Sequence, residues 1–321
     1  MGLCTVSVII PTFNRLPYLK CALRSVEEQT FRNFEVLVLD DGSTDGTVGF
    51  LRGYAPNFSF RWFSFQHKER SHLRNFGAHD AKGEFLAFLD DDDEWLPEKL
   101  EKQVKFLEQN PDVGLVYTRT KVINSEGGLR KKTTTLHKKL YDDQAKRGHC
   151  YSDLAYLTVM FTSTVMIRRS LFLNVGGYDE QCPPKEDLDL YLRCSLVSRV
   201  DCICKEPLVF YRCHEGGSSD CLGDARIKVS QMHLRSIANT PGMDPEGKAK
   251  RAFLFNIAKY HYWAGRYSNA IETIKRLVAE SVSYILRPSH LLLVTKIIMR
   301  WGLHRLGEVG TEENYAANRR S

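Results

Sequence analysis

Short apolar runs rich in β-branched residues alternate along the first part of the chain with segments of helical periodicity. The first run, residues 6–10, stops at Pro11, and apolar residues then recur at helical spacing from 16 to 30. Further strands are predicted at residues 34–39, 58–65 and 85–89, with helices at 44–54 and 71–81. This alternation predicts right-handed βαβ crossovers and a mainly parallel sheet with helices on both faces. We therefore expect the α/β class, in which ligands bind beyond the carboxyl ends of the strands.

The pattern continues with a helix from residue 97 to 110, strands at 113–118 and 163–167, a helix at 187–197 and a strand at 208–211. Residues 121–149 are rich in Lys, Thr and Gly and lack periodicity, so we expect an insertion or mobile loop with little regular structure there. The α/β domain is predicted to close near residue 224. The expected domains are therefore residues 1–224 and 225–321.

Two acidic clusters come directly after predicted strands. The run Asp90-Asp91-Asp92-Asp93 follows residues 85–89, and the run Asp40-Asp41-Gly42-Ser43-Thr44-Asp45 follows residues 34–39. Parallel strands bring both clusters to one edge of the sheet. Crowded carboxylates repel one another, and a divalent cation with oxygen ligands is the usual relief, which predicts a metal site. The alternative is a solvated acidic loop.

Composition is that of an ordinary globular protein. The 321 residues, 43% of them hydrophobic, suffice for one large core or two modest ones. The first residues lack the positive region and long apolar core of a secretion signal. Nine cysteines without a CxxC pair favour reduced thiols in the cytoplasm. Zinc is the alternative for the cluster Cys194, Cys202, Cys204, Cys213 and His214, although its spacings match no standard finger or ribbon.

Positive charge is concentrated in the second predicted domain. Residues 225–321 hold 16 Lys and Arg against 7 Asp and Glu, a net charge of +9, which leaves −3 for residues 1–224 out of the total of +6. An acidic first domain argues against a nucleic-acid groove beside the aspartates. The basic second domain suits anionic lipid, an acidic partner or a plain solvated surface.

The second domain is predicted to be helical. Small and apolar residues between 252 and 277 indicate two helices packed around a turn at Gly265-Arg266. Between residues 284 and 306, four Arg and Lys residues interrupt the apolar ones, so no uncharged span approaches the roughly 18 residues that a membrane crossing requires. We expect this segment either to lie on the inner face of a membrane as a basic amphipathic helix or to pack on the main domain.

Several short motifs occur in a definite order. They are VSVIIPTFNR at residues 6–15, DDGSTD at 40–45, RNFG at 74–77, GEFLAFLDDDDEW at 83–95, GGYDE at 176–180, EDLDL at 186–190 and YRCH at 211–214. Each is weak alone, but the ordered set over roughly residues 4–220 resembles glycosyltransferase family 2, the inverting enzymes of the GT-A fold. The resemblance implies a Rossmann-like, mainly parallel sheet flanked by helices, here with a helical C-terminal extension.

The resemblance also implies roles for the acidic run. Asp90 and Asp92 match the family's DxD positions, with Asp92 as the direct metal ligand and Mn²⁺ or Mg²⁺ as the cation. Such a cation stabilises the charge that grows on the departing diphosphate. Asp91 is expected near the ribose and diphosphate, and Asp93 to support the site. His214 resembles a position that reaches the diphosphate or completes the metal shell, and a structural role is its alternative.

Other matched residues are implied to bind the nucleotide. Pro11, Thr12 and Phe13 line the base pocket, and Asp41 accepts a hydrogen bond from the base, normally uracil. Arg74 corresponds to an arginine near the nucleotide, where its guanidinium also orients Asp41 or a neighbouring carboxylate. Its alternative is an ion pair that only braces the strand ends.

Inversion at the anomeric carbon requires a base opposite the leaving diphosphate. By resemblance this base is Asp187, at the head of a helix. The alternative is that Asp187 caps that helix and Glu186 or Asp189 faces the site instead. Residues 216–219, with the sequence GGSS, are expected either to close over the donor or to form an ordinary surface loop.

Three functions are consistent with these features. The leading hypothesis is a metal-dependent transferase that moves a sugar from a nucleotide-sugar donor, a UDP-sugar, to a glycan or lipid-linked acceptor in cell-surface polysaccharide synthesis. A nucleotidyltransferase on a similar sheet is the second. A nucleotide-sugar sensor without turnover is the third, and the presence of a candidate base argues against it.

Overall fold

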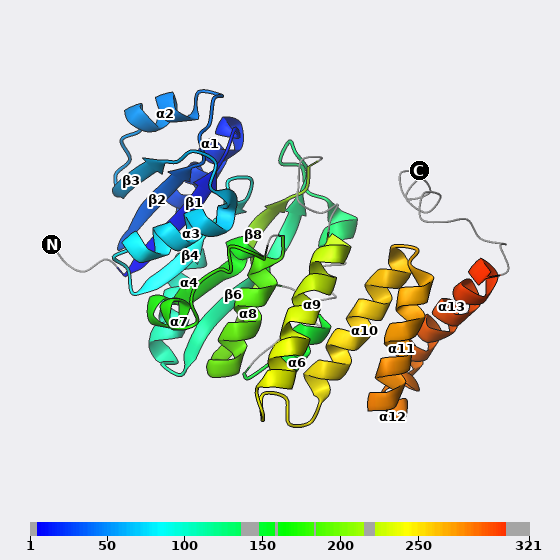
Figure 1. Ribbon diagram of the computed structural model, residues 1–321. Coiled ribbons are helices and arrows are strands. Elements are labelled where there is room, and N and C mark those ends of the chain that lie inside the picture. Colours follow the sequence, from blue (N-terminus) through cyan, green and yellow to red (C-terminus); the bar gives the residue numbers. More distant parts are fainter. Residues whose placement is uncertain (1–4, 136–147, 158–159, 183, 215–221, 306–321) are drawn as a thin grey trace. The chain divides into compact units, whose positions relative to one another are not determined.

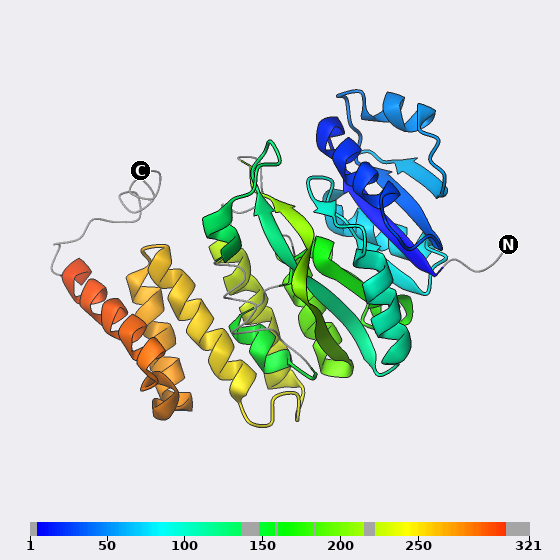
Figure 2. The ribbon, with the colours of Figure 1, turned by 180° about the vertical axis from the view of Figure 1, so that it is seen from behind.

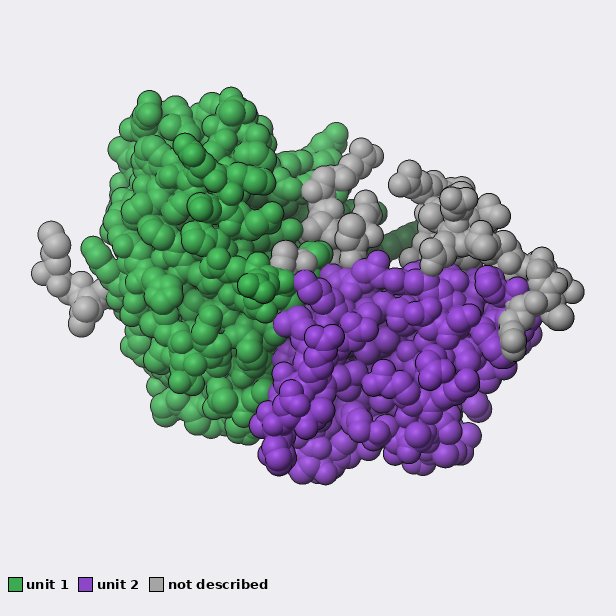
Figure 3. Space-filling view, in the orientation of Figure 1, with its two compact units in different colours: residues 1–150, 159–217 green, residues 151–158, 218–321 purple. Residues whose placement is uncertain are grey.

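The computed structural model describes residues 5–135, 148–157, 160–182, 184–214 and 222–305 (Figure 1). The chain divides into two units, which Figure 3 shows in different colours. Unit 1 comprises residues 1–150 and 159–217, and unit 2 comprises residues 151–158 and 218–321. Residues 151–158 therefore belong to unit 2, although segments of unit 1 precede and follow them in the sequence.

Within the described residues, unit 1 is built on an eight-stranded sheet in the order β3-β2-β1-β4-β7-β6-β8-β5. The strands are β1 (Val6–Thr12), β2 (Phe34–Asp40), β3 (Ser59–Ser64), β4 (Phe85–Phe88), β5 (Glu94–Trp95), β6 (Val113–Ile123), β7 (Val165–Arg168) and β8 (Arg199–Arg212). β1 to β4 are parallel, as the alternating pattern predicts. Beyond β4 the sheet is mixed, because β7 runs antiparallel to β4 and β6, and β5 runs antiparallel to β8.

Helices cover both faces of this sheet (Figures 1 and 2). They are α1 (Leu16–Glu27), α2 (Thr47–Gly53), α3 (Glu69–Asp80), α4 (Lys99–Gln109), α7 (Arg169–Asn174) and α8 (Glu186–Val197), with a 3₁₀ turn, η1, at Thr162–Thr164. α1 begins with Leu16-Pro17, where proline fits the first turn of a helix because no partner for its missing N–H is needed there.

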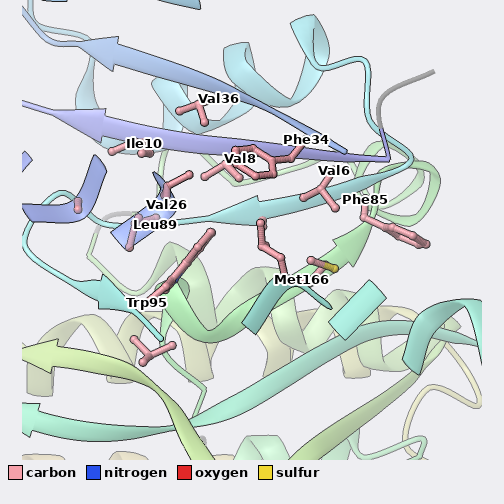
Figure 4. Packing of buried hydrophobic residues seen from close by; sticks show 14 of the residues in the cluster. Val6, Val8, Ile10, Val26, Phe34, Val36, Phe85, Leu89, Trp95 and Met166 are labelled. Atoms are coloured by element: carbon pink, nitrogen blue, oxygen red, sulfur yellow. The ribbon is translucent and has the colours of Figure 1, made fainter. Parts of the chain in front are cut away.

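The side chains of β1 alternate between the two faces. Val6, Val8 and Ile10 join the core formed with α1 and α4 (Figure 4), and all three are fully buried. Ile9 points to the other face, toward α3, where a Cβ on Gly77 would lie 2.8 Å from its Cγ2. Only glycine permits this close approach of α3, so β1 is held tightly between helices and its carboxyl end is fixed.

The prediction of little regular structure over residues 121–149 is wrong in part. β6 continues to Ile123 and pairs with β8 as far as Ile123 and Arg212. Residues 131–135 are helical, and Gly148 forms a bridge with Val200. The strand continues because Thr120 and Val122 are buried while Lys121 between them is half-buried, an alternation that the many Lys and Thr residues obscure. Residues 136–147 lie outside the described part of the chain.

Unit 2 is helical, as predicted. Its helices are α6 (Tyr151–Tyr156), α9 (Leu222–Asn239), α10 (Lys248–Trp263), α11 (Tyr267–Glu280), α12 (Val282–Ile285) and α13 (Pro288–Arg305). The turn predicted at Gly265-Arg266 joins α10 and α11, and Gly265 has a φ of 75°, which glycine adopts without strain. Asn256 of α10 donates hydrogen bonds from Nδ2 to the carbonyls of Ala155 and Tyr156, at 2.6 and 2.9 Å, and so attaches α6 to this unit.

In the part of the chain that the structure describes, no helix combines the length and the apolar character that crossing a membrane requires.

Candidate functional site

The carboxyl ends of β1, β2 and β4 meet at one edge of the sheet. Thr12, the last residue of β1, pairs with Asp40, the last residue of β2, and Asp90 follows two residues after the end of β4. Asp41 continues this arrangement, because its backbone N–H donates to the carbonyl of Thr12 at 2.9 Å. The sheet thus brings the two acidic clusters to the edge where ligands of parallel sheets bind.

Asp91 connects the ends of β1 and β4. Its Oδ2 accepts a hydrogen bond from Thr12 Oγ1 at 2.8 Å, and its Oδ1 lies 3.3 Å from Arg15 Nη1. The residue is 5% exposed. Burial, followed by the charge of Asp92, raises the pKa of Asp91 to about 7. An additional positive charge at this edge would therefore lower the pKa of Asp91 and favour its ionised form.

Asp92 lies between two basic side chains. Arg15 Nη1 donates to Asp92 Oδ2 at 2.8 Å, and His214 Nε2 lies 2.9 Å from the same oxygen. Sequence reasoning assigned Arg15 no role, although the family motif includes it. The sequence feature that could have drawn attention to Arg15 is the preceding Asn14, because asparagine adopts a positive φ more readily than most residues. In the structure Asn14 has a φ of 52° and turns the chain immediately before Arg15. Burial disfavours the charged form of Arg15, but Asp91 and Asp92 outweigh it and raise the pKa of this guanidinium.

Asp93 is fully buried and braces the acidic run from behind. Its Oδ2 accepts from Ser163 Oγ at 2.6 Å, and its Oδ1 accepts from the backbone N–H of Arg212 at 2.9 Å. Burial, with the charges of Asp92 and Asp90, raises the pKa of Asp93 well above its ordinary value. The same Ser163 hydroxyl accepts a hydrogen bond from the backbone N–H of Asp90 at 3.1 Å, so it contacts two residues of the acidic run. Sequence reasoning missed Ser163, which the antiparallel return before β7 carries to this edge.

Arg74 of α3 joins the acidic run to helix α8. Its Nη2 donates to Asp90 Oδ1 at 2.5 Å and its Nη1 to Glu186 Oε1 at 2.9 Å. Arg74 and Glu186 are 2% and 4% exposed, so this is a buried ion pair, and the ring of Tyr178 lies 5.3 Å from the guanidinium. Burial disfavours its charged form, yet the carboxylate of Asp90 and its neighbours raise the pKa of Arg74 above the ordinary value. The guanidinium therefore orients Asp90 rather than Asp41.

The three acidic residues at the start of α8 differ in their partners. Glu186 is paired with Arg74, and Asp189 accepts from Arg193 Nε and Nη2 at 2.9 and 2.6 Å. Among the described residues Asp187 has no ion pair, and its Oδ1 accepts the N–H of Leu188 at 2.8 Å. Asp187 is half-buried, so its carboxylate is the one of the three that remains available to a substrate.

The predicted base pocket lies at the ends of β1 and β2. Pro11 and Thr12 are buried in β1, whereas Phe13 is 44% exposed, with its ring 5.9 Å from that of His67. Asp41 Oδ1 accepts the N–H of Lys68 at 2.6 Å. The second oxygen of Asp41 lies 3.6 Å from His67 Nδ1, beyond ordinary hydrogen-bond distance. At this edge the exposed ring of Phe13 can stack on a planar base, and the carboxylate of Asp41 can accept the N–H of a base.

A divalent cation fits the acidic run. Oxygen atoms of Asp90, Asp92 and Asp93 lie within 4.8 Å of one another, and an all-carboxylate set suits Mg²⁺ or Mn²⁺. Both oxygens of Asp93 already accept hydrogen bonds, whereas the contacts of Asp90 and Asp92 fall on one oxygen each, so Asp90 and Asp92 are the better ligands of the three. His214 stands beside Asp92, where its ring nitrogen can either ligate a cation or hydrogen-bond the carboxylate. The segment with the sequence GGSS, residues 216–219, lies outside the described residues.

The chain resembles known proteins in sequence and in fold. The sequence model described as "Glycosyl transferase family 2" matches residues 7–174. An uncharacterized glycosyltransferase of Haemophilus influenzae is 29% identical over 59% of this chain and 61% of its own length. The putative glycosyltransferase EpsE of Bacillus subtilis is 32% identical over 59% of this chain and 66% of its own. Two rickettsial relatives are matched over only 37% and 32% of their length, so the chain spans between about a third and two thirds of such relatives.

Two kinds of solved structure share the fold. S. aureus TarS 1-349 in complex with UDP-GlcNAc superposes with a TM-score of 0.69 at 20% identity, over 95% of this chain and 92% of that one. The mannosyltransferase PcManGT of Pyrobaculum calidifontis, in complex with GDP-Man and Mn²⁺, gives a TM-score of 0.55 at 19% identity, over 95% and 88%. At these identities the likeness concerns the fold.

Proposed function

Because the chain belongs to glycosyltransferase family 2 and has the GT-A fold with a helical C-terminal region, we propose that it is an inverting glycosyltransferase that uses a nucleotide-sugar donor. One observation carries the proposal furthest. Arg74 bridges Asp90, at the end of β4, and Glu186, the residue before Asp187. The candidate metal ligands and the candidate base are therefore held in one connected set of side chains. A protein that only sensed the donor would have no use for the base.

The proposed donor is a UDP-sugar. Phe13 and Asp41 offer a stacking surface and an acceptor for the imide N–H of uracil. The complexes of TarS with UDP and with UDP-GlcNAc support this choice, although that of PcManGT holds GDP-Man. Thr12 and Arg15 hold Asp91 and Asp92 at the point where the ribose and diphosphate would follow the base.

Asp90 and Asp92 are proposed to hold Mn²⁺ or Mg²⁺, with His214 beside them. A divalent cation so bound stabilises the negative charge that grows on the diphosphate as the sugar leaves. Arg15 places a fixed positive charge on the same edge, 2.8 Å from Asp92. The hydrogen bonds from Ser163 and Arg212 to Asp93 keep the acidic run in one geometry before the donor arrives.

Asp187 is proposed to take the proton of the acceptor hydroxyl. As that oxygen forms its bond to the anomeric carbon, the bond from this carbon to the diphosphate oxygen breaks and the proton passes to the Asp187 carboxylate. The N–H of Leu188 holds one carboxylate oxygen at 2.8 Å, which leaves the other for the acceptor. The proposed acceptor is a glycan or lipid-linked sugar of cell-surface polysaccharide synthesis, used in the cytoplasm or at the inner face of the membrane.

Release of UDP from a panel of nucleotide sugars, with Mn²⁺ and candidate acceptors, tests the proposal. Asp187→Asn should lower turnover by about 10²–10⁴-fold with little change in donor affinity, because only the base is lost. Asp92→Asn should weaken the response to Mn²⁺. Asp153→Asn, an exposed carboxylate of α6, is the matched control and should leave turnover unchanged.

Two other outcomes would replace the proposal. Pyrophosphate released from a nucleoside triphosphate would indicate a nucleotidyltransferase. Donor binding by calorimetry without any turnover, unaffected by Asp187→Asn, would indicate a nucleotide-sugar sensor.

A further inference from the structure

Helix α13 has two apolar faces, and the described residues of unit 2 cover only one of them. His290, Val294 and Ile297 are buried, and Trp301 continues their row one turn later, where it packs against the same core. This core includes residues of α10, α11 and α12. The spacing of four, three and four residues places all of these side chains on one side of the helix. α13 is therefore anchored in its unit by a complete apolar stripe.

The opposite side of α13 carries a second stripe. Leu291, Leu292, Ile298 and Met299 are 43%, 61%, 50% and 62% exposed. Leu291 and Ile298, like Leu292 and Met299, are two turns apart, so the four side chains form one ridge with the exposed Thr295 between them. The segment before α13 exposes Leu286 by 60%. A surface helix in water ordinarily carries charged side chains on the side away from its core, so this ridge is suited to an apolar environment.

All formal charge within α13 and the segment just before it is positive. The sequence contains no Asp or Glu between residues 281 and 305. Lys296 and Arg300 are exposed and follow Leu292 at intervals of four residues, which places them along one flank of the ridge. Arg287 is also exposed, with its guanidinium 4.8 Å from the ring of Tyr284. An occupant of this surface must therefore be apolar at its centre and negatively charged at its rim.

We propose that this surface of α13 lies on a bilayer that contains anionic lipid. The ridge would enter the boundary between headgroups and acyl chains, while Lys296 and Arg300 would contact the phosphates. A second copy of the chain fits less well, because its own Lys296 and Arg300 would face the same cations across the interface. The proposal does not depend on the function of unit 1.

Sedimentation with lipid vesicles tests this surface on the full chain. The vesicles consist of phosphatidylcholine either alone or mixed with phosphatidylglycerol. The wild type should bind the mixed vesicles and bind the neutral ones far more weakly. Lys296→Gln with Arg300→Gln should weaken binding by about 25-fold, since each cation near an anionic surface contributes about a factor of five. Leu292→Glu with Met299→Glu should abolish binding, because carboxylates would enter the apolar boundary next to anionic headgroups.

Matched controls come from unit 1. Val197→Glu changes an apolar side chain that is 58% exposed, and Lys105→Gln removes an exposed cation of α4. Both should bind as the wild type does. All substituted side chains are exposed, so circular dichroism should show unchanged helix content and melting for every variant.

Three results would overturn the proposal. Equal binding to neutral and anionic vesicles would remove the role of Lys296 and Arg300. Unchanged binding of Leu292→Glu with Met299→Glu would place the lipid contact elsewhere. Failure to bind vesicles, together with a dimer by light scattering that this double variant dissociates, would show that the ridge joins two copies of the chain.

Discussion

Removal of the Arg74 guanidinium tests how the acidic run is connected to helix α8. Arg74→Met keeps an apolar stem beside Tyr178 but leaves Glu186, whose side chain is 5% exposed, without its closest cation. Breaking a buried pair on one side costs about 3–5 kcal/mol. We expect a value near the lower end, because Arg70 Nε remains 3.7 Å from Glu186 Oε1. Asp90 is 31% exposed in its side chain and adds little, since water screens it.

A double-mutant cycle separates lost pairing from lost packing. Glu186→Gln removes the stranded charge, so Arg74→Met with Glu186→Gln should recover most of the stability that Arg74→Met alone loses. Hydrogen exchange of peptides from α3, β4 and α8, measured by mass spectrometry over a urea series, reports the free energy of opening in unit 1. Lys102→Met, which breaks an exposed pair with Glu98, is the control and should cost at most about 0.5 kcal/mol.

Additive effects of the two substitutions would refute the reasoning, because they would mean that Arg74 and Glu186 do not stabilise each other. So would a loss below about 1 kcal/mol for Arg74→Met, since a buried carboxylate cannot lose its cation at so small a cost.

Three further predictions follow from other features. Burial and Asp92 raise the pKa of Asp91 to about 7, so its protonated form contributes to the free energy of unfolding fully below the unfolded pKa of about 4, and this contribution is lost as pH rises through about 7. The melting temperature of the cation-free protein should therefore fall over that range, and Mn²⁺ should raise the melting temperature more above pH 7 than below. Gly83→Ala would place a Cβ 2.5 Å from the backbone nitrogen of Ser7, which should cost about 1–3 kcal/mol in urea denaturation, whereas an unchanged midpoint would contradict the tight contact. Burial raises the pKa of Cys194 to about 12, so iodoacetamide should label half-buried Cys21 before Cys194 in native protein, and equal labelling by mass spectrometry would show that Cys194 is accessible.

Local patterns in the sequence were sufficient to predict the parallel half of the sheet and its functional edge. Each strand from β1 to β3 is followed by a helix with its own periodicity, and β4 is a further apolar run, so direction and neighbours follow from crossover rules. The placement of Thr12 beside Asp91, 79 residues apart, depends only on both lying at carboxyl ends of adjacent strands. The motif resemblance to the family, confirmed by the family match over residues 7–174, then implied chemical roles for the residues at this edge.

The remaining site residues depend on contacts that no local pattern encodes. Ser163 reaches Asp93 because β7 runs antiparallel to β4, and alternation of strands and helices predicts the opposite direction. Arg212 contributes a backbone N–H, which any residue there would possess. Arg74 was expected near the nucleotide. Its simultaneous pairing with Asp90 and Glu186 requires that α8 lie next to α3, although more than a hundred residues separate Arg74 and Glu186 in the sequence.

Helix α6 has a consequence for the order in which the chain folds during synthesis. Its residues 151–156 leave the ribosome before α9 and α10, yet Tyr151 and Leu154 are buried in the finished unit, where Asn256 of α10 holds the end of the helix. Nascent chains fold in the order in which they are made. The strands on either side of α6 can therefore pair while its apolar side is still exposed to water, and this stretch is a candidate site for chaperone contact during synthesis.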